Sequence, residues 1–380
     1  MIKKIRFLLV ALIISSATII QAQVTTSSMS GRVTDAEGAV IGATVIATHE
    51  SSGTTYGTVT NLEGRFNLNG MRVGGPYTVE VTYIGYGAYT ANNITLSLGE
   101  NYSLNVVLSE ETTTLGEVVV TALRTKFSNQ KTGAVTNITN AQIDNLPTVS
   151  RNIMDVTRLS PYGGNGMSFG GADGRSSNFT VDGANFNNNF GLSDGLPGGG
   201  NPISLEAIEE MQVVIAPYDV RQTNFIGGGV NAITKSGTNT FKASAYIYHR
   251  NENLRGDAVR GEQIEGARER DRNTTYGFTF GGPIIKNKLF FFVNGELAKT
   301  PTVANRWKAS TDGVADPDNY ISRTTENDMK KVSEFVSSKY GYNTGSYTNF
   351  PADESNEKLL ARLDWNITNQ HRLALRYNYT

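Results

Sequence analysis

Strict alternation of apolar and polar side chains between residues 241 and 380 constrains the fold more than any other feature. In the run 358–367, Leu359, Leu363 and Trp365 alternate with charged or polar residues, and the run 371–379 repeats the pattern. A period of two is typical of β-strands that bury one face. Apolar-out, polar-in strands with aromatic residues near their ends are typical of transmembrane β-barrels, although a soluble sandwich also alternates.

The connections between these strands favour the barrel. Five strands are expected, at residues 241–250, 274–282, 289–297, 357–367 and 371–379. The connections are alternately long and polar, over 251–273 and 299–356, and short and turn-like. Outer-membrane barrels have long extracellular loops and short periplasmic turns. Because an open sheet edge cannot lie in lipid, we expect these strands to be the start of an incomplete barrel.

The N-terminus, residues 1–22, carries the pattern of a secretory signal peptide. Lys3, Lys4 and Arg6 form a positive segment, residues 7–14 are apolar, and a small residue precedes the expected cleavage point. The alternative is a membrane anchor, but the uninterrupted apolar run is shorter than the roughly 20 residues that a spanning helix needs. Because no later stretch reads as a helical span, any membrane-spanning part is expected to be a β-barrel.

Charge and cysteine content exclude several classes of function. Lys and Arg number 34 against 35 Asp and Glu, which gives no electrostatic basis for nucleic-acid binding. The chain has 0 cysteines, so it holds neither a disulfide nor a thiolate metal site. The 40 glycines favour turns, and the abundant Thr and Tyr favour strands.

Two domains are expected before the barrel strands. Short alternating runs separated by turn signals predict a small β-sandwich over residues 23–110, with strands at 30–33, 43–47, 56–60, 77–81 and 102–108. A glycine-rich α+β domain is expected over residues 131–238. Its expected strands lie at 134–138, 179–183 and 211–215, and residues 227–235 close the domain. Short helices are expected at 152–159 and 204–210, and a short capped helix or turn at 140–147.

Between these domains, the linker 111–130 contains one short β-prone segment, Glu117-Val118-Val119-Val120-Thr121-Ala122. Valine favours extended backbone because branching at Cβ restricts its rotamers in a helix. A lone strand in a polar linker offers unpaired backbone groups to the sheet edge of a partner. The alternative is the last strand of the sandwich. Because the sandwich is expected to close at Leu108, we favour a freely hanging docking strand.

Two groups of motifs along the chain resemble those of known domains. Residues 31–35, 64–68 and 77–86 resemble the carboxypeptidase regulatory-like domain, and residues 180–183, 207–213 and 228–239 resemble the plug domain of TonB-dependent outer-membrane receptors. Residues 215–222 and 281–292 are similar to the Oar-like branch, whereas the plug signature of SusC-like receptors is not well matched. The resemblance implies a mainly β chain: a sandwich, an α+β plug, and the first strands, from residue 239, of a truncated barrel of about 22 strands.

The resemblance also implies a function. The protein would take up a nutrient (a peptide, glycan or metal chelate) across the outer membrane, contacting its lipid, with the plug gated by TonB together with ExbB and ExbD. Glu117–Ala122 would be the TonB box, lying with the sandwich in the periplasm. Arg175, Asp182 and Arg221 are implied to contact the barrel from the plug, because buried charges need partners. The alternative for the two arginines is a solvated surface.

No catalytic residue, cofactor or metal site is expected. Residues 166–170 match the Gly-x-Ser-x-Gly pattern, but Ser168 lacks the preceding strand and following helix of a nucleophile elbow. His49, His249 and His371 are too far apart in sequence to suggest a zinc site. The alternative function is a secreted or surface glycan-binding protein built around the sandwich.

Overall fold

The computed structural model describes residues 24–110, 118–121, 133–148, 150–187, 196, 201–217, 219–254, 256, 258–263, 272–301, 307–345 and 353–380. It divides into two units. The first contains Met1–Ala243, Thr279–Asn294 and Lys358–Thr380, and the second contains Ser244–Phe278 and Gly295–Glu357. The expected signal peptide lies outside the described residues. None of the described helices is long and apolar enough to cross a membrane.

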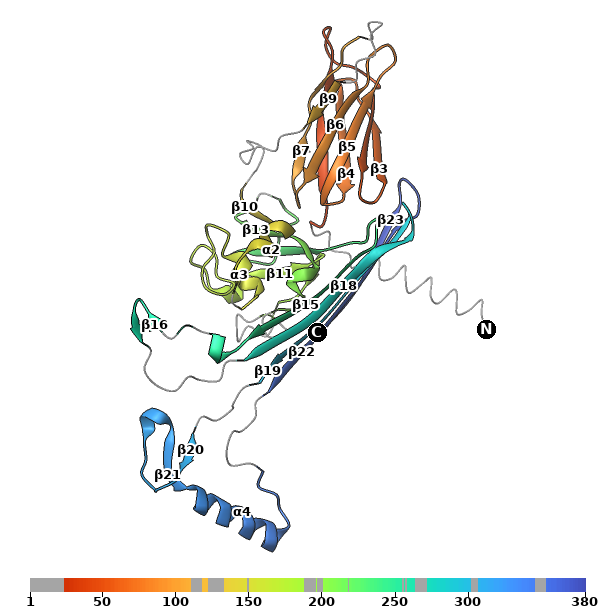
Figure 1. Cartoon of the computed structure of the whole chain (residues 1–380). Coiled ribbons are helices and arrows are strands. Elements are labelled where there is room, and N and C mark those ends of the chain that lie inside the picture. Colours follow the sequence, from red (N-terminus) through yellow and green to blue (C-terminus); the bar gives the residue numbers. More distant parts are fainter. Residues whose placement is uncertain are drawn as a thin grey trace. The chain divides into compact units, whose positions relative to one another are not determined.

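The N-terminal sandwich consists of two sheets around one core (Figure 1). One sheet has the order β4 (Arg65–Met71), β1 (Ser27–Thr34), β7 (Asn101–Ser103), with β8 (Val106–Val107) also paired with β1. The other has the order β3 (Thr54–Val59), β2 (Thr44–His49), β5 (Gly74–Thr82), β6 (Tyr89–Leu96), β9 (Val118–Thr121). Val45 and Ala47 of β2 pack in the core with Val79 and Val81 of β5, since alternate side chains of a strand share one face.

Strand β6 is absent from the expected strands because its sequence is largely polar. Only Ala91, Ile94 and Leu96 of this strand are buried in the core. Its pairing with β5 contains register shifts on either side of Tyr77, so the pattern of burial is not a strict period of two. The regular alternation on which the strand predictions rest is therefore interrupted here.

The second domain, the expected plug and hereafter the plug, is built on a five-stranded sheet. Its order is β10 (Ala134–Thr139), β13 (Ile208–Ile215), β14 (Gly229–Thr234), β11 (Asn178–Val181), β12 (Ala184–Asn185). Helices α2 (Asn140–Asn145) and α3 (Ile153–Thr157) contribute Ile143 and Ile153 to its core, beside Phe179 and Met211. The Oδ1 of Asn152 caps α3 by accepting from the N–H of Met154 at 3.0 Å.

One expected helix of the plug is wrong. Residues 204–210 form a single 3-10 turn, η3 (Leu205–Ala207), and strand β13 begins at Ile208. Ser204 does cap the turn, because its hydroxyl accepts from the N–H of Glu206 at 3.3 Å. The strand prevails because β13 is paired on both sides, by β10 and by β14, over most of its length.

The five expected C-terminal strands are confirmed and form one sheet, hereafter the wall. Its order is β15 (Lys242–Arg250), β18 (Asn273–Ile285), β19 (Leu289–Thr300), β22 (Glu354–Asn366), β23 (Arg372–Tyr379). β22 and β23 are antiparallel, with Leu359 opposite Tyr379 and Asn366 opposite Arg372. The tight turn between them keeps this register in phase with the alternation of their side chains.

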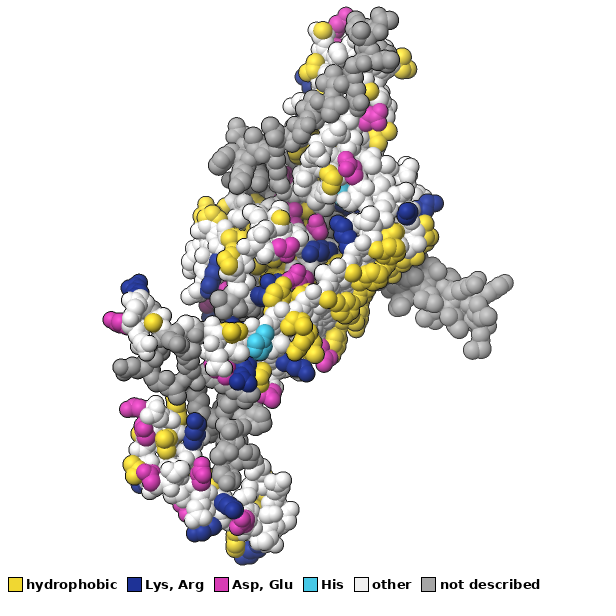
Figure 2. Space-filling view, viewed as in Figure 1, with side chains coloured by type: hydrophobic (Ala, Val, Ile, Leu, Met, Phe, Trp, Pro, Cys, Tyr) yellow, Lys and Arg dark blue, Asp and Glu magenta, His cyan; other side chains and the backbone are white. Residues whose placement is uncertain are grey.

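The two faces of the wall differ in chemistry. On one face of β22 and β23 the apolar residues are exposed, namely Leu359, Leu363, Trp365, Leu373, Leu375, Tyr377 and Tyr379. On the other face Lys358, Leu360 and Asp364 of β22 are buried. Figure 2 shows hydrophobic side chains gathered along these strands. A continuous exposed apolar face of this kind marks a contact with membrane or protein.

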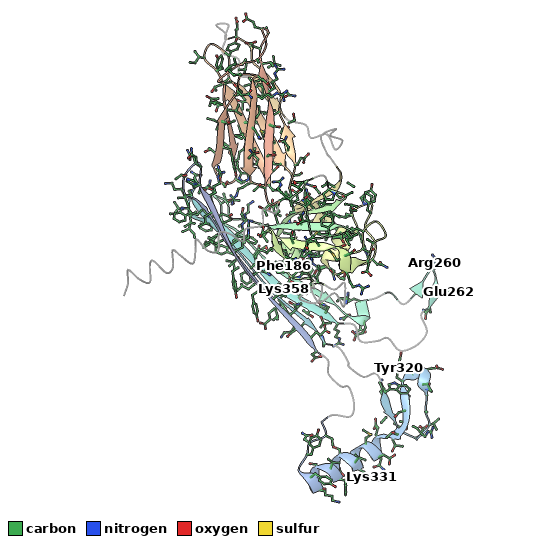
Figure 3. The ribbon with its side chains drawn as sticks, turned by 180° about the vertical axis from the view of Figure 1, so that it is seen from behind. Phe186, Arg260, Glu262, Tyr320, Lys331 and Lys358 are labelled. Carbon is green, nitrogen blue, oxygen red and sulfur yellow. The ribbon has the colours of Figure 1, made fainter. Side chains whose placement is uncertain are left out.

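The second unit contains ordered segments within the two long connections. The first connection holds η4 (Glu252–Leu254), β16 (Ala258–Val259) and β17 (Glu262–Gln263). The second holds β20 (Lys308–Ser310), η5 (Pro317–Asn319), β21 (Ile321–Thr325) and α4 (Glu326–Tyr340). In Figure 3, Arg260 and Glu262 mark the first and Tyr320 and Lys331 the second. The connection over 299–356, expected as a long polar loop, therefore also contains a helix and two short strands.

Candidate functional site

A cluster of buried charges, hereafter the charge cluster, joins the plug to strands β22 and β23 of the wall. Arg362 is at its centre, with a side chain only 11% exposed. Its Nε and Nη2 donate to the carboxylate of Asp364 at 2.8 and 2.9 Å. Its Nη1 donates to the carbonyl oxygen of Thr234 in the plug at 2.6 Å. Arg362 thus binds a wall carboxylate and the plug backbone at the same time.

Asp182 is the plug carboxylate of the charge cluster. It lies with Gly183 in the two-residue turn between β11 and β12, at φ values of 49° and 87° that an Asp-Gly hairpin favours. Its side chain is 3% exposed, and its Oδ2 lies 3.1 Å from the Nε of Arg376. Its Oδ1 lies 3.8 Å from the Nη1 of Arg362. The carboxylate also accepts from the N–H and the hydroxyl of Thr234, at 3.0 and 2.6 Å.

The charges of this cluster compensate one another only in part, since three arginines face its two carboxylates. Arg362 and Arg376 face the carboxylates of Asp182 and Asp364, and the Nη2 of Arg72, from the sandwich, lies 3.4 Å from Asp364. Buried ion pairs lose hydration and are stable only when their remaining donors and acceptors are satisfied. The contacts of Asp182 with Thr234 meet this requirement. Removal of one partner from such a cluster typically costs about 3–5 kcal/mol.

Arg175 and Arg221, the other two residues expected to contact the wall, pair with carboxylates in their own loops. The Nη2 of Arg175 lies 2.8 Å from Asp173, and the Nη2 of Arg221 lies 2.7 Å from Asp219. Both arginine side chains are about half exposed, at 52% and 51%. The hydrogen bonds from Arg175 lower the pKa of Asp173 to about 2. The structure brings Asp182, but neither of these arginines, into the charge cluster.

The wall residues of the charge cluster are missing from the expected site. Arg362, Asp364 and Arg376 occupy the polar positions between the exposed apolar residues of β22 and β23. Arg362 lies directly opposite Arg376 on the neighbouring strand. Two like charges at facing positions are unfavourable unless anions separate them. The facing arginines, together with the two-residue turn at Asp182 and Gly183, are the sequence signal that could have identified these wall residues.

Residues Val118–Thr121, the described part of the expected box, form strand β9 on the sandwich. β9 runs parallel to β6, with Val118 opposite Tyr89 and Thr121 opposite Asn92. Glu117 and Ala122 lie outside the described residues. The expectation that this segment hangs free is therefore wrong. The expected closure of the sandwich at Leu108 overlooked β6, whose edge is open to one more strand.

Ser168 and His49, two other residues considered for catalysis or metal binding, form hydrogen bonds within their own domains. The hydroxyl of Ser168 donates to the carbonyl oxygen of Ala172 at 2.6 Å. The Nδ1 of His49 lies 2.7 Å from the hydroxyl of Ser52 inside the sandwich. The described residues contain no group of three His, Cys, Asp or Glu side chains arranged to hold a metal ion.

The sandwich has a polar hollow of about 460 Å³. It is lined by Ser28, Ser30, Asn61, Arg65, Phe66, Asn67, Asn69 and Asn101. Hydroxyl and amide groups can hydrogen-bond to sugar hydroxyls. The ring of Phe66 is buried, at 4% exposure, so this lining offers no accessible aromatic face to a ligand. The hollow therefore gives the glycan-binding alternative only polar contacts.

Comparison with known proteins identifies domains at both ends of the chain. The carboxypeptidase regulatory-like domain family matches residues 28–109, and an outer membrane beta barrel domain family matches residues 233–380. The chain is 26% identical over 285 residues to the TonB-dependent transporter Oar of Myxococcus xanthus. That match covers 70% of this chain, which spans 26% of the relative's length.

Solved outer-membrane proteins are also similar. The siderophore receptor PirA of Pseudomonas aeruginosa is 17% identical over 65% of this chain and 34% of its own, with a TM-score of 0.41. The outer membrane transporter YddB of Escherichia coli is 14% identical over 64% of this chain and 33% of its own, with a TM-score of 0.43. Because these TM-scores are low, the similarity to outer-membrane transporters rests on the two domain families and the Oar relative. TonB-dependent receptors are not enzymes. The chain thus matches a carboxypeptidase regulatory-like domain and an outer membrane beta barrel domain, and it is similar to a TonB-dependent transporter.

Proposed function

We propose that the protein imports a nutrient across the outer membrane, with TonB acting on the box, residues 117–122, to move the plug. The observation that supports this proposal best is the charge cluster, which holds Asp182 of the plug against Arg362 and Arg376 of the wall. Charged groups that separate can exchange their protein partners for water. A plug attached in this way can be released and bound again without exposing a large apolar core.

The energy for this release comes from the inner membrane. ExbB and ExbD use its proton gradient, and TonB transmits the resulting pull to the box. A substrate bound outside thereby passes through the space that the displaced plug leaves. The substrate class proposed is a peptide, a glycan or a metal chelate.

Contacts between the sandwich and the ends of the wall strands support a periplasmic location for the sandwich and box. The Nδ2 of Asn366, at the end of β22, donates to the hydroxyl of Thr54 in the sandwich at 3.0 Å. The N–H of Asn239, just before β15, donates to the carbonyl oxygen of Ser51 at 2.8 Å. These strand ends adjoin the short turns, and short turns of outer-membrane barrels are periplasmic.

Replacement of one box residue tests the proposed role of TonB. Val119→Pro removes a backbone donor in the middle of the box and should abolish binding of the periplasmic domain of TonB to the purified receptor. Val119→Thr keeps the branched side chain and the donor, so its binding should match that of the native receptor. Binding by Val119→Pro at native affinity would contradict the proposal.

A further inference from the structure

Strand β9 occupies the last position of its sheet, next to β6. All four of its residues are paired in one continuous parallel register, without the shifts found between β5 and β6. β6 itself is fixed to the sandwich by Ala91, Ile94 and Leu96 in the core. The described part of the box, β9, is therefore paired with a strand that is itself fixed in the core.

The chain before the box places it close to this edge. Glu110 forms a bridge with Tyr86, and the N–H of Gly87 donates to the carbonyl oxygen of Ser109 at 3.0 Å. β9 begins at Val118, which lies opposite Tyr89. Tyr89 is only three residues after Tyr86, the residue that forms the bridge with Glu110. The steps from Glu110 to Val118 can span roughly 26 Å, whereas three residues extend over roughly 10 Å. The segment between Glu110 and Val118 is thus long enough to reach β6. It is also short enough to give the box a high effective concentration there.

A β-strand has two hydrogen-bonding edges, and β6 uses only one edge of β9. Among the described residues, no strand pairs with the other edge. An ordered strand with one open edge is the usual template for strand addition. Because its backbone is already fixed, a partner strand need not order it again on binding.

We propose that the sandwich holds the box as a pre-formed edge strand on β6, and that a strand of TonB adds to the outer edge of β9. The sandwich is then part of the TonB-binding site, since its sheet extends through β9 into the partner. This inference rests on the proposed binding of TonB to the box.

Paired cysteines test the docking of β9 on β6. Residues 1–380 contain 0 native cysteines, so within this part of the receptor an engineered pair can give only one disulfide. Asn92→Cys with Thr121→Cys joins residues that face each other in the observed register. Asn92→Cys with Val120→Cys is the control, because a shift of one residue turns the side chain to the opposite face. The first pair should cross-link several-fold faster than the second in the complete receptor. Equal rates would overturn the proposal.

The cross-linked receptor then tests how TonB binds. With the Asn92–Thr121 pair oxidised, the periplasmic domain of TonB should bind with an affinity equal to or above that of the reduced receptor, because the outer edge stays open. Loss of binding on oxidation, restored by a reductant, would show that the box must leave β6 and would overturn the inference. If the native receptor does not bind TonB, the proposed function fails, while the cross-linking rates still decide whether β9 lies on β6.

Discussion

Asp182 and the two arginines Arg175 and Arg221 belong to the same domain, but their charges are satisfied in different ways. Asp182 is buried at 3% exposure and pairs with arginines of distant wall strands. Arg175 and Arg221 are half exposed and pair with Asp173 and Asp219, each two residues away. Local pairs are screened by water and contribute little, whereas the buried pairs couple two domains. Position, more than charge, therefore decides which residues attach the plug.

The largest effect is expected for Asp182→Asn. The amide retains the shape and can still accept from the N–H of Thr234, but it removes the negative charge that faces the buried Arg362 and the partly exposed Arg376. We expect the free energy of plug opening to fall by about 3–5 kcal/mol. Hydrogen exchange of the β11 and β14 amides in the solubilised receptor measures this loss. Asp173→Asn is the matched control and should leave these amides unchanged, since Asp173 pairs only at the surface.

His49 extends the comparison to a buried group of the sandwich. Burial, with a smaller effect of Arg72, lowers its pKa from 6.5 to about 4. As the pH falls below 6.5 the unfolded chain binds a proton that the folded sandwich does not, so stability should decrease between pH 6.5 and 4 and level off on either side. The loss should reach about 3 kcal/mol.

Chemical denaturation of the sandwich, residues 24–110, measures this dependence, since the sandwich has its own core. His49→Phe should remove this part of the pH dependence. If the stability of that variant depends on pH as the native sandwich does, another titrating group causes the dependence.

The smallest effects are expected for the surface arginines. Arg175→Ala and Arg221→Ala remove exposed local pairs, so each should change the free energy of plug opening by less than about 1 kcal/mol. Added salt should reduce even this difference. A loss as large as that of Asp182→Asn, measured by the same hydrogen exchange, would mean that these arginines also attach the plug.

The alternation of apolar and polar side chains predicted the wall strands, because a strand with one apolar face shows a two-residue period in its sequence. The same criterion missed α4, although Thr325 caps it by accepting from the N–H of Asp328 at 3.1 Å and Gly341 ends it at a φ of 63°. These capping signals are visible in the sequence, but the polar composition of the segment obscured them. Before Ile208, the capping residue Ser204 suggested a helix over 204–210. A strand forms from Ile208 instead, because β13 pairs with a neighbouring strand on each edge.

The charge cluster shows where sequence reasoning stops. Asp182 can be identified because an Asp-Gly turn after a buried strand is a local signal. Its partners Arg362 and Arg376 depend on the register of β22 with β23 and on the placement of the plug turn beside them. The pairing of β9 with β6 is equally non-local, since the paired residues Tyr89 and Val118 lie about thirty positions apart in the sequence.

A double-mutant cycle between Asp182→Asn and Arg376→Gln tests most directly whether the plug is attached to the wall through buried charges. Hydrogen exchange of β11 and β14 would be measured in the native receptor, the two single variants and the double variant. We predict strong non-additivity, with a coupling free energy above about 1 kcal/mol and a double variant no less stable than Asp182→Asn alone. Additive losses, within roughly 0.5 kcal/mol, would contradict direct attachment of the plug through this pair.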